Sequence, residues 1–331
     1  MKYRRLGNAG VKLSEIGLGG WLTFGKTTGE STGRALIETA FEQGINFFDT
    51  ANVYAQGACE TMWGDLLQPY QRPSFVLASK VYFPMGDGPN DRGLSRKHIM
   101  EQCEASLKRL GTDYIDLYQC HRYDDETPLE ETLRAMDDLV HQGKILYWGF
   151  SCWPSEKIRA AVRLCGDRLY APVSSQPHYN LLMRDIEAEV LPACNELGIG
   201  QVVFSPLEQG ILTGKYRPGD KPEMNTRLVN AADAQEASWK NKATARNFEI
   251  AAVVEAIVTL AHRLNLRVIV EGIESKEQFA RVKALGCDFA QGYLFSKPLA
   301  YADFAAYLGD FERAGGRVAP AVNRWLPVAN T

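Results

Sequence analysis

The chain has 331 residues, 45% hydrophobic and 23% charged, which suits a globular protein with one large domain or two small ones. Its 37 basic and 40 acidic residues give a formal charge of −3, so neither nucleic acid nor a membrane surface is expected as the main partner. Residues 1–5 are not followed by an apolar region, and Glu255 and His262 interrupt the most apolar stretch, so we expect neither a signal peptide nor a membrane span.

In chain order, short apolar runs alternate with longer amphipathic segments. The apolar runs carry β-branched or aromatic residues and are too short for helices, which predicts strands. The predicted strands are Glu15–Gly19, Asn46–Thr50, Phe75–Val81, Tyr114–Cys120, Leu146–Ser151, Val173–Gln176 and Gly200–Ser205. The amphipathic segments predict helices at Ser31–Gln43, Ser95–Leu110, Leu129–Gln142 and Ile186–Leu197, with a further helix starting at Pro154.

Strict alternation of strands and helices predicts parallel strands joined by right-handed crossovers. Seven such units exceed the needs of a typical doubly wound sheet. They favour an α/β fold of the (β/α)8 TIM-barrel type, which takes about 250 residues. Before the first unit, residues 3–13 carry a Gly-Asn-Ala-Gly turn between two short extended runs, which predicts an N-terminal β-hairpin.

The sequence after the seventh unit changes character. Residues 218–247 are polar and weakly periodic, which indicates a linker or an active-site loop. Helices and strands are expected to alternate again beyond them, at Phe248–Leu264, Arg267–Glu271, Lys276–Leu285 and Phe289–Phe295. The expected division of the chain is therefore 1–217, 218–247, 248–310 and a tail of 311–331.

Four reactive side chains lie where the C-terminal ends of neighbouring strands are expected, which is where (β/α)8 barrels place their active sites. Asp49, Lys80 and His121 end or follow three strands, and Tyr54 lies in the loop after Asp49. A tyrosine has a pKa near ~10, and a nearby ammonium lowers this pKa because it favours the phenolate. A carboxylate would hold the ammonium and an imidazole would orient a carbonyl group. The phenol could then protonate the carbonyl oxygen as hydride arrives.

These positions lie within motifs that resemble a known family. The segment Asn46–Tyr54, the pair Ser79-Lys80 and the run Gln119–His121 resemble the signatures of the aldo-keto reductases. The resemblance covers residues 1 to about 217. The run Phe83–Arg96 resembles the branch that contains potassium-channel β-subunits and glyceraldehyde-phosphate-type reductases.

The resemblance implies a role for each of the four side chains. Tyr54 would be the general acid, Asp49 and Lys80 would tune its acidity, and His121 would orient the carbonyl group. The resemblance also implies NADPH as the hydride donor and a small aldehyde or ketone as the substrate.

The chain has no Gly-x-Gly-x-x-Gly fingerprint, so a nicotinamide cofactor would need another way of being held. The residues that the resemblance implies for the cofactor are Trp21, Thr23, Ser151, Gln176, Phe204, Ser205, Leu207, Gly210, Leu212 and Lys215. Ser151 and Gln176 would bind the nicotinamide carboxamide, and Phe204 would stack under the ring. The residues from 205 to 215 would wrap the pyrophosphate. Cys152 departs from the family, which often has Asn or Arg at this position.

Other polar residues have a structural interpretation. The seven cysteines are odd in number and have no Cys-x-x-Cys spacing, so we expect reduced thiols in a cytoplasmic protein. His98 and His141 fall in helical stretches and are expected at the surface, whereas His178 is expected to line the pocket. Val203 is expected in the core.

The C-terminal segment resembles a different family. Residues 268–275 and 291–299 resemble the end of an EAL-type cyclic-di-GMP phosphodiesterase domain, over about Ile250–Leu308. The resemblance places Glu271 near that family's metal site and Gln291 against its nucleotide. The Glu-Ala-Leu motif and most of that family's metal ligands are missing. The two metals needed for hydrolysis could not be held, and we expect no metal and a structural role.

Both families form TIM barrels, so the segment 248–310 could complete the reductase barrel, with Arg267–Glu271 as the eighth strand, or be appended to it. The leading functional hypothesis is an NADPH-dependent reductase of small aldehydes or ketones. A cofactor-binding regulatory or scaffold protein with little turnover stays open, as does an assembly of identical subunits. Cyclic-di-GMP hydrolysis is disfavoured. The sequence does not specify which carbonyl compound is the substrate.

Overall fold

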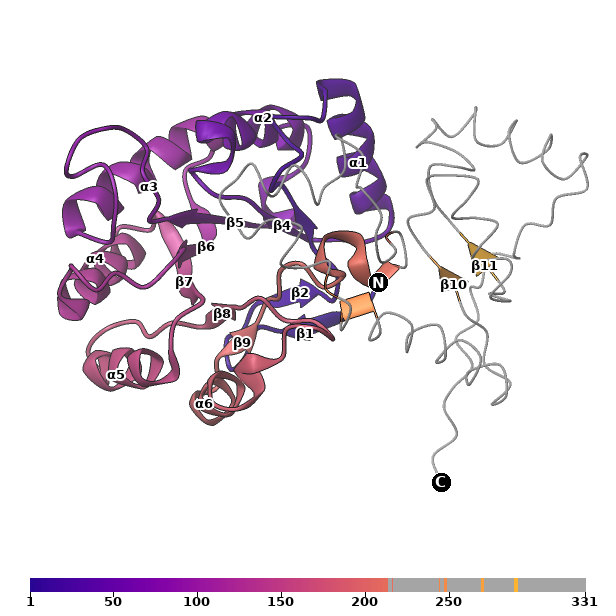
Figure 1. Ribbon diagram of the computed structural model, residues 1–331. Coiled ribbons are helices and arrows are strands. Elements are labelled where there is room, and N and C mark those ends of the chain that lie inside the picture. Colours follow the sequence, from indigo (N-terminus) through magenta and orange to yellow (C-terminus); the bar gives the residue numbers. More distant parts are fainter. Residues whose placement is uncertain (214–215, 217–243, 245–246, 249–268, 271–288, 291–331) are drawn as a thin grey trace, which may run out of the picture. The chain divides into compact units, whose positions relative to one another are not determined.

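The computed structural model describes residues 1–213, 216, 244, 247–248, 269–270 and 289–290, which are the coloured ribbon in Figure 1. Its centre is a parallel sheet of seven strands that follow one another in chain order. The strands are β3 Leu18–Gly19, β4 Phe47–Asp49, β5 Val76–Val81, β6 Ile115–Cys120, β7 Ile145–Ser151, β8 Ser174–Gln176 and β9 Gly200–Gln201. All seven predicted strands are confirmed, and each pairs in parallel with the next.

Helices run between successive strands and lie outside the sheet in Figure 1. They are α1 Glu30–Glu42, α2 Ala58–Leu67, α3 Arg96–Leu110, α4 Leu129–His141, α5 Ser155–Cys165 and α6 Val190–Leu197. Short 3-10 turns are η1 Tyr54–Gly57, η2 Arg72–Ser74, η3 Asp185–Glu187 and η4 Glu208–Thr213. The helices predicted between residues 31 and 197 are confirmed, whereas α2 has no counterpart among the predictions. Three left-handed residues, with φ of 50°, 53° and 90° at Ala55, Gln56 and Gly57, precede α2 in place of an ordinary helix start.

The predicted N-terminal hairpin is formed by β1 Tyr3–Arg5 and β2 Lys12–Ser14, which pair antiparallel. The hairpin contacts both ends of the strand order. In its turn, Asn8 N donates a hydrogen bond to Gly198 O at 2.8 Å, beside β9. Its last residue, Ser14, accepts a hydrogen bond from the backbone of Asn46, beside β4. A hairpin this short reaches both β4 and β9 only because the sheet curls around it.

The inside of the curled sheet is apolar next to the hairpin. Two hairpin residues pack there against side chains from β4, β5 and β6, and the cluster consists of Leu6, Leu13, Phe47, Val76, Ala78 and Leu117. A larger cluster fills the space between the sheet and the helices and includes Phe48, Trp63 and Trp148, none more than 1% exposed. The seven-stranded curled sheet, its outer helices and the hairpin are those of a TIM-like α/β fold, as predicted.

Two further strands, β10 Ile269–Val270 and β11 Phe289–Ala290, pair in parallel in a sheet of their own. They fall within the predicted strands Arg267–Glu271 and Phe289–Phe295. The segment 218–247 and the helices and tail predicted beyond it lie almost wholly outside the described residues, as do Glu271 and Gln291. The division at 217, 247 and 310, and the closure of the barrel by the C-terminal segment, therefore stay predictions.

Two minor predictions are wrong. Val203 is 40% exposed and lies beyond Gln201, the last residue of β9. His98 is 1% exposed rather than at the surface. It lies in the first turn of α3, which Ser95 caps through its hydroxyl group.

Gly149 in β7 lies so close to the neighbouring strand that its replacement tests the packing inside the sheet. A Cβ atom at this position would lie 2.0 Å from Ser174 Oγ and 2.6 Å from Ser174 O in the neighbouring strand β8. We expect Gly149→Ala to destabilise the fold by about 1–3 kcal/mol, the usual cost of overpacking. Urea unfolding measures this. Gly10→Ala is the control, since a Cβ atom there meets nothing within 4 Å. Equal stability of the two variants would contradict the packing.

Candidate active site

Parallel pairing brings the four predicted reactive residues to one end of the sheet. Asp49 is the last residue of β4, and Lys80 lies near the end of β5. Lys80 pairs with Gln119 in β6, two residues before His121. Tyr54 begins the turn η1. Just before this turn, Asn52 N donates to Lys80 O at 3.2 Å, which joins the loop to the neighbouring strand β5. Side chains from three adjacent strand ends and one loop therefore converge.

Lys80 is the centre of the arrangement and is fully buried. Its Nζ donates to Asp49 Oδ2 at 2.6 Å, to Thr50 O at 2.7 Å and to Tyr54 Oη at 3.4 Å. These three acceptors match the three N–H groups of an ammonium. Burial lowers the pKa of Lys80, and the charge and hydrogen bond of Asp49 oppose this shift.

The hydroxyl group of Tyr54 accepts a hydrogen bond from Lys80. An ammonium can only donate, so Tyr54 Oη must accept from Lys80 Nζ, which leaves the phenol hydrogen for another acceptor. On the other side, the Tyr54 and His121 rings meet edge to face with centroids 5.8 Å apart. A carbonyl oxygen placed beside both groups could accept this hydrogen.

His121 is 7% exposed, and its Nδ1 has no hydrogen-bond partner among the described residues. Burial lowers the pKa of His121 well below its ordinary value, and the charges of Lys80 and Arg122 lower it further. The imidazole is therefore neutral near pH 7. A neutral imidazole could orient a carbonyl group by hydrogen bonding, whereas it is a weak acid near pH 7.

The buried histidines predict how stability depends on pH. Burial lowers the pKa of both His98 and His121 below the value of about 6.5 in the unfolded chain. Between the folded and unfolded values the unfolded chain binds more protons, so stability falls as the pH drops below ~6.5. The slope is at most about 1.4 kcal/mol per pH unit for each histidine.

Urea unfolding between about pH 7 and pH 5 measures this slope. We expect His98→Gln and His121→Gln each to reduce it. A slope that is the same in the parent protein and in both variants would contradict the assignment of neutral, buried imidazoles.

The predicted carboxamide ligands are neighbours. Ser151 ends β7 and pairs with Gln176, which ends β8. Ser151 Oγ donates to Gln176 O at 2.8 Å, and Gln176 Nε2 donates to Asp49 Oδ1 at 3.0 Å. Cys152 is exposed, has a left-handed φ of 54°, and places its Sγ 3.6 Å from Ser151 Oγ.

Phe204 follows β9 and stacks on His178, with ring centroids 4.9 Å apart and planes inclined by 15°. His178 Nε2 lies 2.6 Å from Oε2 of Glu208, a buried carboxylate in the next turn. The backbone turns sharply here, with left-handed φ values at Ser205, Glu208, Gln209 and Gly210. The predicted ligands from Ser205 to Leu212 thus follow one another through this tight turn.

The remaining predicted ligands differ in exposure. Leu207 is 54% exposed, whereas Leu212 is buried. Trp21 and Thr23 are half-buried and lie in the loop after β3, next to Asp49, because Gly20 N donates to Asp49 O at 2.9 Å. Lys215 lies outside the described residues.

These residues fit the nicotinamide end of a dinucleotide. A hydroxyl group and a side-chain amide stand side by side at Ser151 and Gln176, which is the donor and acceptor set that a carboxamide requires. Phe204 adds an aromatic ring at the end of the next strand. The loop from Ser205 to Gly210 contains four left-handed residues, and Glu208 N and Gly210 N donate within it, to Ser205 O and Leu207 O.

Three residues that the sequence patterns did not single out also contribute. Gln119 is fully buried and approaches Asp49, and Glu208 anchors His178. Arg122 Nη1 donates to His121 O at 2.6 Å, and its guanidinium lies 5.4 Å from the centre of the Phe83 ring. Gln119 could have been identified from the sequence, because alternate residues of a strand face the same side and Gln119 lies two residues before His121.

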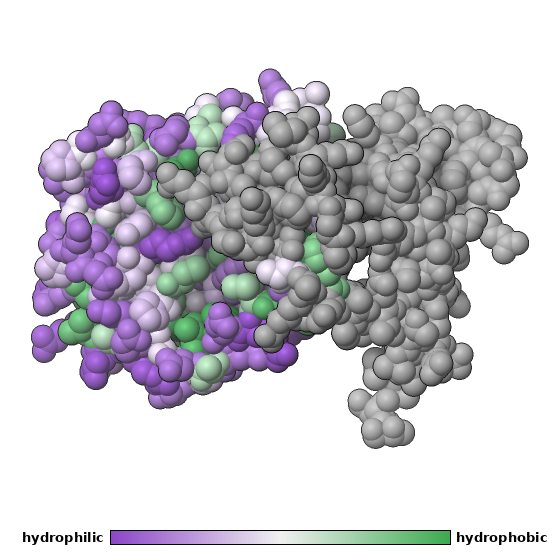
Figure 2. Space-filling view, in the orientation of Figure 1, coloured by the Kyte–Doolittle hydropathy of each residue, from purple (hydrophilic) through white to green (hydrophobic). Residues whose placement is uncertain are grey.

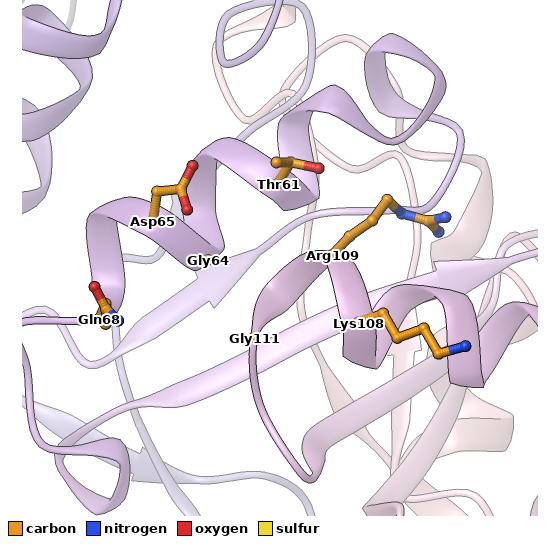
Figure 3. A pocket seen from close by; sticks show the side chains of 7 residues that line it. All are labelled: Thr61, Gly64, Asp65, Gln68, Lys108, Arg109 and Gly111. Atoms are coloured by element: carbon orange, nitrogen blue, oxygen red, sulfur yellow. The ribbon is translucent and has the colours of Figure 1, made fainter.

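Other features of the described part of the chain do not compete with this site. A cavity of about 400 Å³ lies between α2 and α3, on the outside of the sheet, and Figure 3 shows the residues that line it. Its lining side chains, such as Thr61, Asp65 and Lys108, point away from one another rather than converging. Figure 2 shows mainly hydrophilic residues around the rim of the visible described face, as expected for helices in contact with water. No helix among the described residues has the length and apolar character required to cross a membrane.

The sequence model described as the Aldo/keto reductase family matches residues 15–267, and the model described as the EAL domain matches residues 242–298. Three relatives carry names that describe potassium-channel subunits. The chain is 42% identical over 227 residues to a probable voltage-gated potassium channel subunit beta of Arabidopsis thaliana, a match that covers 67% of this chain and 69% of the relative. A protein of the same description from Oryza sativa subsp. japonica is 42% identical over 226 residues, with the same coverage. A putative voltage-gated potassium channel subunit beta of Schizosaccharomyces pombe is 45% identical over 224 residues, covering 66% of this chain and 65% of the relative.

Proposed function

Because this chain belongs to the aldo/keto reductase family, we propose that it is an NADPH-dependent oxidoreductase that reduces the carbonyl group of small aldehydes or ketones to an alcohol. The observation that carries the proposal is the hydrogen-bonded series from Asp49 through Lys80 to Tyr54, with a neutral His121 beside it. Each member has the chemical property that its role in carbonyl reduction needs.

In the proposed mechanism, the substrate oxygen lies between Tyr54 and His121. The neutral imidazole orients this oxygen, and Tyr54 Oη gives up its proton to it as hydride reaches the carbonyl carbon. Lys80 stabilises the phenolate that remains, because its ammonium already contacts Tyr54 Oη. Asp49 keeps the ammonium charged and in place within a buried site. The bound cofactor supplies the hydride.

The proposed cofactor site uses the residues expected from the sequence. Ser151 and Gln176 would hold the carboxamide and Phe204 would support the ring. Trp21 and Thr23 would border the ribose and the substrate. Ser205, Leu207, Gly210, Leu212 and Lys215 would surround the pyrophosphate. The adjacency of Ser151 and Gln176 in neighbouring strands and the tight turn after Phe204 support this arrangement.

A second candidate function follows from the names of the relatives, which describe channel β-subunits. In that case the chain would bind NADPH, turn over slowly and act through a partner protein. The EAL-like segment would have a structural role in either case.

Two measurements distinguish these functions. NADPH binding is followed by fluorescence titration, and NADPH oxidation is followed with a panel of small aldehydes and ketones. Binding with ready turnover of at least one carbonyl compound supports the reductase. Tight binding with negligible turnover across the panel favours the regulatory protein, and absence of NADPH binding contradicts both.

A further inference from the structure

The two oxygen atoms of Asp49 have different environments. Oδ2 accepts from Lys80 Nζ at 2.6 Å. Oδ1 lies 3.0 Å from Gln176 Nε2 and 3.4 Å from Gln119 Nε2. An ionised carboxylate can only accept hydrogen bonds, so both amides must turn their nitrogen atoms towards it. Asp49 is thus held on one side by a cation and on the other by two amide groups.

Gln119 lies deeper in the sheet than the other donors. It belongs to β6 and is fully buried, directly opposite Lys80 in the strand register. Its Oε1 is 3.5 Å from Ser174 Oγ in β8, and Gly149 in the intervening strand β7 leaves the room that Ser174 needs. A chain of polar contacts therefore runs from Ser174 through Gln119 to Asp49. It lies deeper in the sheet than the residues that would face the substrate.

A side-chain amide at this depth has an energetic cost. Moving the Gln119 amide from water into the protein interior costs free energy, and its two long hydrogen bonds recover only part of this cost. An apolar side chain of the same size at this position would be tolerated by the fold or would even stabilise it. The side chain that precedes Gln119 on the same strand face, Leu117, is apolar and packs into the core. The polar group at Gln119 is therefore better explained by its contact with Asp49 than by the stability of the fold.

We propose that Gln119 is a positioning residue for the reaction, whose amide fixes Oδ1 of Asp49 so that Oδ2 holds Lys80 Nζ against the Tyr54 hydroxyl. This inference rests on the proposed carbonyl-reductase function. Gln119 touches neither the substrate nor the cofactor. It acts through Asp49 and Lys80.

Gln119 differs in this respect from Gln176. Gln176 would also meet the nicotinamide carboxamide, so its substitution would change both the cofactor affinity and the rate. Gln119 approaches Asp49 from β6, away from the strand ends of Ser151 and Gln176. Substitution of Gln119 is therefore expected to change kcat with little effect on NADPH affinity.

The test compares Gln119→Met with Gln119→Glu. Met keeps the length of the side chain but donates nothing. A glutamic acid donates to Asp49 only while it is protonated, and once ionised it places two carboxylates next to each other. The matched control is Gln201→Met in β9, a side chain whose amide atoms are also buried and for which no described contact reaches Asp49.

We expect Gln119→Met to lower kcat about tenfold at every pH, with NADPH affinity and thermal stability close to those of the parent protein. Gln119→Glu should stay close to parental activity at acidic pH and fall to the level of the Met variant as the pH rises. Gln201→Met should keep the parental kcat. Parental kcat in Gln119→Met, or the same loss at all pH values in Gln119→Glu, would overturn the proposal.

A second measurement does not depend on turnover. The tyrosinate absorbance is measured against pH for each protein and for its Tyr54→Phe counterpart. The difference between the two curves follows the ionisation of Tyr54 alone. In Gln119→Met this ionisation should move to higher pH, because a less firmly held ammonium favours the phenolate less. An unchanged titration would overturn the role of Gln119 even in a protein without turnover, whereas absence of turnover in the parent protein would count against the proposed function.

Discussion

Replacing Tyr54 by Phe is expected to lower kcat for aldehyde reduction by about 10²–10⁴-fold, the contribution usual for a general acid. The ring and its contact with His121 remain, and only the hydroxyl group is lost. Lys80 keeps Asp49 and Thr50 as acceptors, so the fold should not suffer. NADPH affinity should change little, because Tyr54 is not among the proposed cofactor ligands. Steady-state kinetics combined with cofactor titration measures both quantities.

The control for this variant is Tyr118→Phe in β6. Tyr118 is fully buried and its hydroxyl group has no hydrogen-bond partner among the described residues, so its loss should leave both activity and stability unchanged or slightly improve stability. A Tyr54→Phe variant that keeps most of its activity would show that another group donates the proton.

Lys80→Met should combine a loss of activity with a loss of stability. It removes the cation that Asp49 faces and leaves a carboxylate that is only 17% exposed. Breaking a buried ion pair in this way costs about 3–5 kcal/mol. Turnover should also fall by about 10²-fold or more, because Tyr54 loses the group that stabilises its phenolate. Urea unfolding and steady-state kinetics are the measurements.

The double variant Asp49→Asn with Lys80→Met separates the two effects. Neutralising Asp49 removes the uncompensated charge, so part of the lost stability should return. Activity should not return, because the ammonium beside Tyr54 is still missing. A double variant no more stable than Lys80→Met would contradict the role of the ion pair in the fold.

The sequence predicts the sheet well because its signals are local. The strands from β4 Phe47–Asp49 to β7 Ile145–Ser151 are short runs rich in apolar residues, and their alternation with helical segments predicts the order and direction of the strands. The four reactive residues follow, because parallel strands bring their C-terminal ends together. Their predicted positions and the observed contacts of Lys80 agree.

What the sequence does not predict depends on contacts between distant segments. The start of α2 follows three left-handed residues at 55–57, a conformation that Ala55 and Gln56 seldom adopt and that no local pattern marks. His98 has the spacing of a surface residue, yet it is buried. In the sequence, Gln119 is a polar residue within a mostly apolar predicted strand, and nothing beside it indicates its contacts. Only the neighbouring strands show that its amide meets Asp49 and Ser174.

The most direct test of the reductase proposal is transfer of deuterium from NADPH that carries two deuterium atoms at the reactive carbon of the nicotinamide. The protein would be incubated with the labelled cofactor and an aldehyde, and the alcohol would be analysed by mass spectrometry. We expect deuterium on the former carbonyl carbon in the parent protein and almost none in Tyr54→Phe. Unlabelled alcohol, or no alcohol at all from a protein that binds NADPH, would contradict the proposed reductase function.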